Sequence, residues 1–153
     1  MSTSRRPRIH VLAGVNGAGK SSIGGATVRH YGGEYFNPDE VARAIREKDP
    51  ALTQAAVNSV AWRQGASLLN RAIEERLEFT FETTLGGNTI TSLLTKAAAQ
   101  GIEVHVWYVG LVSPELHIER VQARVSRGGH DIPAYWAHRR WLRLGAQAAN
   151  WRR

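Results

Sequence analysis

The sequence predicts an α/β protein with a mainly parallel sheet, and two observations support this prediction. Short β-prone runs alternate with helical segments along the 153 residues, an order typical of parallel sheets covered by helices. A glycine-rich phosphate-binding motif joins the first of these runs to the first helix. A chain of this length builds one hydrophobic core, so we predict a single domain over residues 1–153, with residues 1–8 as a flexible basic tail.

The first element is the β-prone run Ile9 to Ala13, which leads directly into the loop GVNGAGKS. This loop fits the pattern G-x-x-x-x-G-K-[ST], in which backbone N–H groups surround phosphates, the lysine reaches the β- and γ-phosphates, and the final hydroxyl ligates Mg²⁺. A helix from Lys20 to Tyr31 is expected to follow and to add its unpaired N–H groups to the anion site. We therefore expect ATP or GTP with Mg²⁺, the metal bound by Ser21, and nucleotide contacts from Gly14, Asn16, Gly17, Ala18, Gly19, Lys20, Ser21 and Ser22.

The second strand candidate, Glu34 to Phe36, is followed by the helix start Asn37-Pro38-Asp39-Glu40. Asn37 is the expected N-cap, and the helix is predicted to run to about Lys48. Asp39 lies just after the strand, at the edge where open α/β sheets bind ligands. It is a candidate catalytic carboxylate, although acidic residues also favour the first turn of any helix.

A long helix is predicted over Ala51 to Leu77, and Gly65 in its middle indicates a close helix contact. The β-prone run Phe79 to Thr84 comes next. Glu82 and Thr84 are two residues apart and are predicted to project to the same side of the strand. They are candidates to hold substrate hydroxyls or to support the Mg²⁺ shell. The alternative is a strand end that emerges into solvent.

The alternation of helices and strands continues with a predicted helix over Asn88 to Gln100 and a predicted, strongly buried strand over Val104 to Val109. No carboxylate ends that strand, which argues against a motor ATPase. Ser113-Pro114 is predicted to start a helix that ends at Gly128-Gly129, and another helix is expected from Pro133 to Asn150. The first of these carries three arginines on one face, at i, i+4 and i+7, which can neutralise transferring phosphate or form a solvated basic face: Arg120, Arg124 and Arg127.

The composition favours anionic partners, because the chain has 17 Arg against 3 Lys and a formal net charge of +7. The arginines are scattered and no nucleic-acid-binding motif is present, so a nucleic-acid partner is not the first expectation. No run approaches the roughly 18 apolar residues of a membrane helix, and no secretory segment or cysteine is present. We expect a cytoplasmic protein with no membrane partner.

Four sequence pieces occur together in this order: AGVNGAGKSS at 13–22, FNPDEVA at 36–42, FETTL at 81–85, and the arginine segment that ends in RGGHDIP at 127–133. Together they resemble the zeta-toxin-like P-loop kinases, which include bacterial proteins often labelled predicted ABC-type ATPases. The resemblance covers nearly the whole chain. It implies a three-layer P-loop NTPase/kinase fold with a five-stranded parallel sheet. We find four strand candidates in this sequence, so we expect the last strand to be absent.

The resemblance implies ATP-dependent phosphorylation of UDP-N-acetylglucosamine on a sugar hydroxyl. Asp39 would then be the base, Glu82 and Thr84 would hold the nucleotide sugar, and Arg120 and Arg127 would clamp phosphates, with Arg124 as a further candidate. An antitoxin protein is the candidate partner. Two alternatives remain open: a kinase for another acceptor, such as a nucleoside, a sugar acid or a nucleic-acid end, and a shortened ATP-binding module without turnover.

Overall fold

In the part of the chain that the structure describes, four parallel strands form the sheet, in the order β2-β3-β1-β4. They are β1 (Arg8–Gly14), β2 (Glu34–Phe36), β3 (Phe79–Thr83) and β4 (Glu103–Val109). The computed structural model describes residues 6–15, 18–22, 34–111 and 113–128. Most of the helix expected over Lys20 to Tyr31, all of the one over Pro133 to Asn150, and residues 1–5 of the expected tail lie outside this range; residues 20–22 are helical. The α/β class and the parallel sheet are confirmed.

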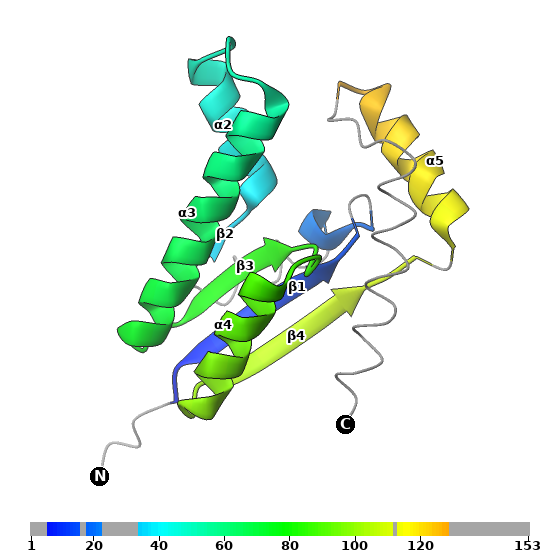
Figure 1. Ribbon diagram of the computed structural model, residues 1–153. Coiled ribbons are helices and arrows are strands. Elements are labelled where there is room, and N and C mark those ends of the chain that lie inside the picture. The colour runs from blue at the N-terminus through cyan, green and yellow to red at the C-terminus, as the bar shows by residue number, and fades with distance from the viewer. Residues whose placement is uncertain (1–5, 16–17, 23–33, 112, 129–153) are drawn as a thin grey trace.

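β1 lies in the interior of the sheet, which accounts for its apolar residues. Its neighbours are β3 and β4, and from Val11 to Gly14 every residue is buried, as both faces of a covered parallel strand require. α3 (Gln54–Glu74) and α4 (Asn88–Ala99) pack against the sheet, and their apolar residues join the strands in the main core. Figure 1 shows these two helices on the same face of the sheet.

The expected strongly buried strand at Val104 to Val109 is a strand but is not strongly buried. β4 lies at the edge of the described sheet, and its side chains are half-buried or exposed; Trp107 is 44% and Tyr108 40% exposed. A mostly apolar run such as this one predicts burial on both faces, but the run itself does not say whether its strand lies at the centre or at the edge of the sheet.

α2 (Pro38–Lys48) begins as the sequence predicts. The Asn37 side chain accepts hydrogen bonds from the backbone N–H groups of Asp39 and Glu40, at 2.9 and 3.4 Å. α2 and α3 form a pair held by a small apolar cluster of Ala42, Val57 and Ala61. In Figure 1 this pair extends beyond the carboxyl ends of the strands, and α5 (Pro114–Val125) extends on the opposite side.

α3 is shorter at both ends than the predicted span Ala51 to Leu77. Thr53 caps its start by accepting from the N–H of Ala56. Its end is a Schellman turn, in which the N–H of Leu77 bonds the carbonyl of Ala72 and Arg76 adopts the left-handed conformation with φ 55°. Glycine is the usual residue at the left-handed position of this turn. Because arginine takes that position here, the sequence carries no signal for the end of the helix.

Gly65 marks a close contact, but the partner is a strand residue and not another helix. A Cβ added there would lie 2.6 Å from Cε1 of Phe36, the last residue of β2. The absence of a side chain therefore lets α3 lie directly against the phenyl ring that precedes Asn37 and Asp39.

Candidate active site

Three chain segments that follow parallel strands meet at one edge of the sheet. The phosphate-binding loop follows β1, Asn37 and Asp39 follow β2, and Glu82 lies near the end of β3. Register places Glu82 opposite Leu12 of β1, just before the loop, which begins at Gly14. Because all four strands point the same way, their carboxyl ends form a shared crevice, which is where ligands bind in open α/β sheets.

The two glycines that flank the described parts of the loop adopt backbone conformations that favour glycine. Gly14 has φ +145°, and a Cβ there would lie 2.1 Å from the carbonyl oxygen of Val109, so no side chain fits. Gly19 has φ +92° and precedes the helical residues 20–22. Asn16 and Gly17, two of the predicted nucleotide contacts, lie outside the described residues.

Lys20 is held inside this loop. Its Nζ donates to the carbonyl oxygens of Gly14 at 2.9 Å and Val15 at 3.0 Å, and the residue is only 9% exposed. Two backbone carbonyls thus keep a buried ammonium at the loop. A charge in this position fits the β- and γ-phosphates of a nucleotide.

Glu82 is buried beside the loop and does not face solvent. The residue is 6% exposed, Ser21 Oγ donates to its Oε2 at 3.0 Å, and the Tyr35 hydroxyl donates to its Oε1. Burial, and then this hydrogen bond to Glu82, raise the pKa of Tyr35 above its ordinary value. The Ser21 hydroxyl and the Glu82 carboxylate are both hard oxygen groups, a donor set that fits Mg²⁺.

A cleft of about 1390 Å³ opens above the loop, between α2 and α3 on one side and α5 on the other. Gly19, Lys20, Ser21 and Ser22 line its floor together with Glu82, and Asp39 lines the α2 side. Across from them lie all three arginines of the predicted basic face: Arg120, Arg124 and Arg127. The structure therefore brings together the loop, Asp39, Glu82 and the arginine helix.

Thr84 is not among the residues that line the cleft, and neither are Gly14 and Ala18, which are buried in and below the loop. β3 ends at Thr83, and Leu85 adopts a left-handed φ of 50°, so the strand alternation expected to pair Glu82 with Thr84 stops before Thr84. A side-chain period of two holds only while the backbone stays extended.

Sequence reasoning missed five polar residues of the cleft and the tyrosine that holds Glu82. The five line the α2 and α3 wall: Arg43, Arg46, Glu47, Gln54 and Asn58. A signal for the arginines exists, because Asp39, Arg43 and Arg46 fall at i, i+4 and i+7, one face of a helix. No local pattern identifies Gln54, Asn58 or Tyr35, whose roles depend on tertiary packing.

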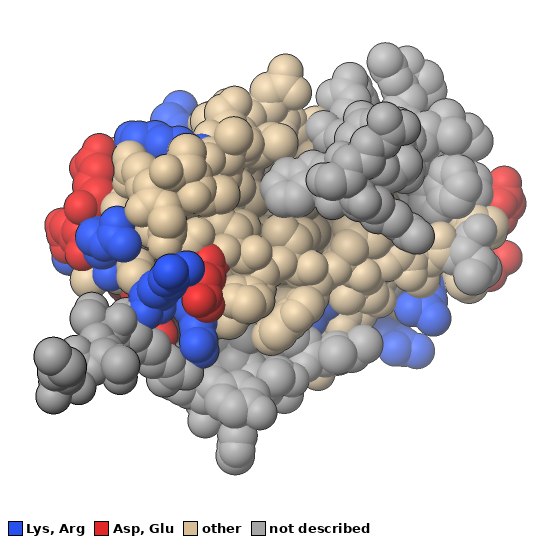
Figure 2. All heavy atoms as spheres, turned by 90° about the horizontal axis from the view of Figure 1, so that it is seen from below, with Lys and Arg blue, Asp and Glu red and all other residues tan. Residues whose placement is uncertain are grey.

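Positive charge is concentrated in the cleft, whose lining includes one lysine, five arginines and three carboxylates, Asp39, Glu47 and Glu82. The side of the molecule opposite the cleft, seen in Figure 2, instead shows basic and acidic side chains next to one another beside a broad area with neither. The local excess of cations fits a ligand with several negative charges.

The sequence also matches a known protein family. The model of the zeta toxin family matches residues 1–143. This protein belongs to the zeta toxin family. A further relative, an uncharacterised protein of Haemophilus influenzae, is 32% identical over 123 residues, which make up 78% of this chain and 81% of the relative.

Solved structures place this zeta toxin family member in the P-loop kinase fold. A chain of the Pnkp1/Rnl/Hen1 RNA repair complex superposes with a TM-score of 0.71 at 14% identity, over 97% of this chain and 47% of that one. A protein from Chloroflexus aurantiacus described as a kinase gives 0.66 at 14% identity, over 84% and 72%. A gluconokinase from Sinorhizobium meliloti 1021 gives 0.53 at 22% identity, over 92% and 76%. None of the described helices combines the length and apolarity of a membrane-spanning helix.

Proposed function

We propose that this zeta toxin family protein is an ATP-dependent kinase that phosphorylates a hydroxyl group of a nucleotide sugar, with UDP-N-acetylglucosamine as the first candidate. The observation that carries the proposal is the single cleft that joins the phosphate-binding loop to Asp39 and to the arginines of α5. Phosphoryl transfer needs a phosphate cradle, a base beside the acceptor hydroxyl and cations around the transferring group, and this cleft has a candidate for each.

The residues divide into donor and acceptor roles. Lys20 and Ser21, with the loop backbone, would hold the ATP phosphates, and Ser21 and Glu82 would hold Mg²⁺. When bound, Mg²⁺ would neutralise charge on the β- and γ-phosphates. Asp39 would accept the proton of the acceptor hydroxyl as its oxygen bonds the γ-phosphorus and the bond to ADP breaks. Arg120, Arg124 and Arg127 would stabilise the charge on the transferring group.

A second acceptor class is a 5′-hydroxyl end of a polynucleotide. The likeness to a chain of an RNA repair complex supports it, and so does the cationic lining of the cleft. Both acceptors carry phosphate near the reacting hydroxyl. A sugar acid, the third class, is supported by the weaker likeness to a gluconokinase.

Product analysis tests the proposal. The full chain is incubated with ATP and Mg²⁺ and, in turn, with UDP-N-acetylglucosamine, a 5′-hydroxyl oligonucleotide and gluconate, and products are identified by mass spectrometry. We expect an acceptor heavier by one phosphoryl group, formed with ADP. Lys20→Ala should lose both ATP binding and product, because it removes the buried ammonium of the loop. ATP binding without product from any acceptor would instead support the binding module without turnover.

A further inference from the structure

The cleft contains cations that the proposed transfer step does not use. Arg43 and Arg46 lie on α2, on the same face as Asp39, and all three line the cleft. At about 1.5 Å of rise per residue, the Cα atoms of Arg43 and Arg46 lie roughly 6 and 10 Å along the helix from that of Asp39. The two arginines therefore lie farther along α2 from its start than the candidate base does, in the same cleft.

The α3 wall positions one of these arginines. Arg46 Nη1 donates to Gln54 Oε1 at 2.5 Å, and Gln54 Nε2 donates to Asn58 Oδ1 at 2.9 Å. All three side chains line the cleft. The apolar cluster of Ala42, Val57 and Ala61 fixes the two helices against each other behind this chain of hydrogen bonds. The amide oxygen of Gln54 satisfies one N–H of Arg46 and leaves the guanidinium its full charge.

Neither arginine is neutralised by a protein carboxylate. Glu47 lines the same part of the cleft, yet in the described part of the chain no carboxylate lies within ion-pair distance of Arg43 or Arg46. The positive charges of Arg43 and Arg46, which are neighbours on one helix face, repel each other unless an anion binds between them. Guanidinium groups bind phosphate through paired hydrogen bonds, which favours phosphate over a neutral sugar as the group that fits here.

We propose that Arg43 and Arg46 form a subsite for a phosphate group of the acceptor, so that the enzyme selects acceptors with a phosphate a few bonds from the reacting hydroxyl. The inference rests on the proposed function, because Asp39 defines the acceptor side. The phosphate has two possible sources, the diphosphate of a nucleotide sugar or the first phosphodiester of a polynucleotide. The arginines of α5 would contact the donor phosphates and are separate from this subsite.

The subsite is tested by acceptor binding, measured with the nucleotide site filled. The full chain is saturated with a non-hydrolysable ATP analogue and Mg²⁺ and titrated by calorimetry with two matched pairs. UDP-N-acetylglucosamine is compared with N-acetylglucosamine, and the 5′-hydroxyl dinucleotide UpU with uridine. We expect at least one phosphate-bearing member to bind more tightly than its phosphate-free counterpart. The pair that shows the difference identifies the source of the phosphate.

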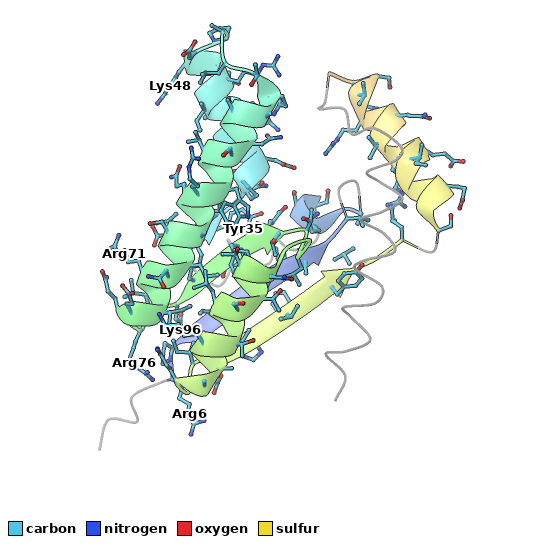
Figure 3. The ribbon with its side chains drawn as sticks, viewed as in Figure 1. Arg6, Tyr35, Lys48, Arg71, Arg76 and Lys96 are labelled. Carbon is cyan, nitrogen blue, oxygen red and sulfur yellow. The ribbon has the colours of Figure 1, made fainter. Side chains whose placement is uncertain are left out.

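The variant R43Q/R46Q should weaken binding of that phosphate-bearing acceptor by roughly tenfold or more, since a hydrogen bond to a charged group contributes about 1.5–3 kcal/mol. Binding of its phosphate-free counterpart should change less than about twofold. The matched control is K48Q/R63Q, which removes the same charge from exposed positions of α2 and α3 outside the cleft lining. Figure 3 shows Lys48 pointing away from α5. The control should bind like the wild-type protein.

Equal binding of both members of both pairs would overturn the subsite, and so would equal losses in R43Q/R46Q and K48Q/R63Q. Product formation in the mass-spectrometric assay is independent of these results. If product forms but acceptor binding is unchanged in R43Q/R46Q, the subsite is contradicted and the kinase activity stands. If acceptor binding depends on the two arginines but no acceptor is phosphorylated, the kinase activity is contradicted and the subsite stands.

Discussion

At the scale of single residues, Glu82 takes its role from its neighbours. The sequence predicted a functional carboxylate at this position, and the structure buries it between the Ser21 and Tyr35 hydroxyls. Its partner Tyr35 was not predicted, because the contact depends on the pairing of β2 with β3, strands more than forty residues apart along the chain. Periodicity indicates which face a side chain occupies and carries no information about the strand beside it.

The Tyr35–Glu82 hydrogen bond predicts a pH-dependent stability. The pKa of Tyr35 is raised in the folded protein above the value of about 10 that tyrosine has when unfolded. The contribution of Tyr35 to the free energy of unfolding is therefore fully present below a pH of about 10. It is lost as the pH rises above that value, because the hydroxyl proton leaves the unfolded chain first. Tyr35→Phe should unfold more easily at pH 8, and its deficit should shrink at higher pH.

Urea unfolding of the wild-type protein and Tyr35→Phe at pH 8 and near pH 10.5 measures this effect. The deficit at pH 8 should be about 1–3 kcal/mol, since a buried carboxylate loses one of its donors. Tyr108, whose pKa burial also raises, is present in both proteins and cancels in the difference. Parallel pH profiles for the two proteins would show that Tyr35 does not titrate as proposed.

At the scale of helices and strands, cap residues and strand runs were predictable where the signal is local. Asn37 caps α2 as expected, Ser113-Pro114 starts α5 as expected, and all four strand candidates are strands. The end of α3 and the exposure of β4 were not predictable. The first depends on a left-handed Arg76 in place of glycine, and the second depends on the order of the strands in the sheet. Neither is encoded by a short window of sequence.

The contact between Gly65 and Phe36 predicts that a usually favourable substitution is harmful. Gly65→Ala gains up to about 1 kcal/mol of helix propensity, but its methyl group would press on a buried ring. Overpacking of a core costs about 1–3 kcal/mol, so we expect a net loss of stability. Chemical denaturation of Gly65→Ala, with and without Phe36→Leu, measures it. The smaller leucine should relieve most of the clash, and equal losses in both backgrounds would contradict this explanation.

At the scale of the whole molecule, the candidate site is a product of topology. Parallel strands bring the phosphate-binding loop, Asp39 and Glu82 to one edge, and α2, α3 and α5 enclose them in one cleft. The sequence predicted these contributors because each carries its own motif. The remaining wall, with Arg46 held by Gln54, follows from the packing of α2 against α3 and needed the structure.

The central claim is that Asp39 is the base of a phosphoryl transfer whose nucleotide is held elsewhere in the cleft. Asp39→Asn keeps the size of the side chain and removes its basicity, and the loop lysine that would hold the nucleotide is itself held by the carbonyl oxygens of Gly14 and Val15. The most direct measurement compares nucleotide affinity and the single-turnover transfer rate in this variant and the wild-type protein. We expect affinity within about twofold and transfer slower by about 10²–10⁴-fold. Transfer at the wild-type rate, or loss of nucleotide binding together with transfer, would contradict the account.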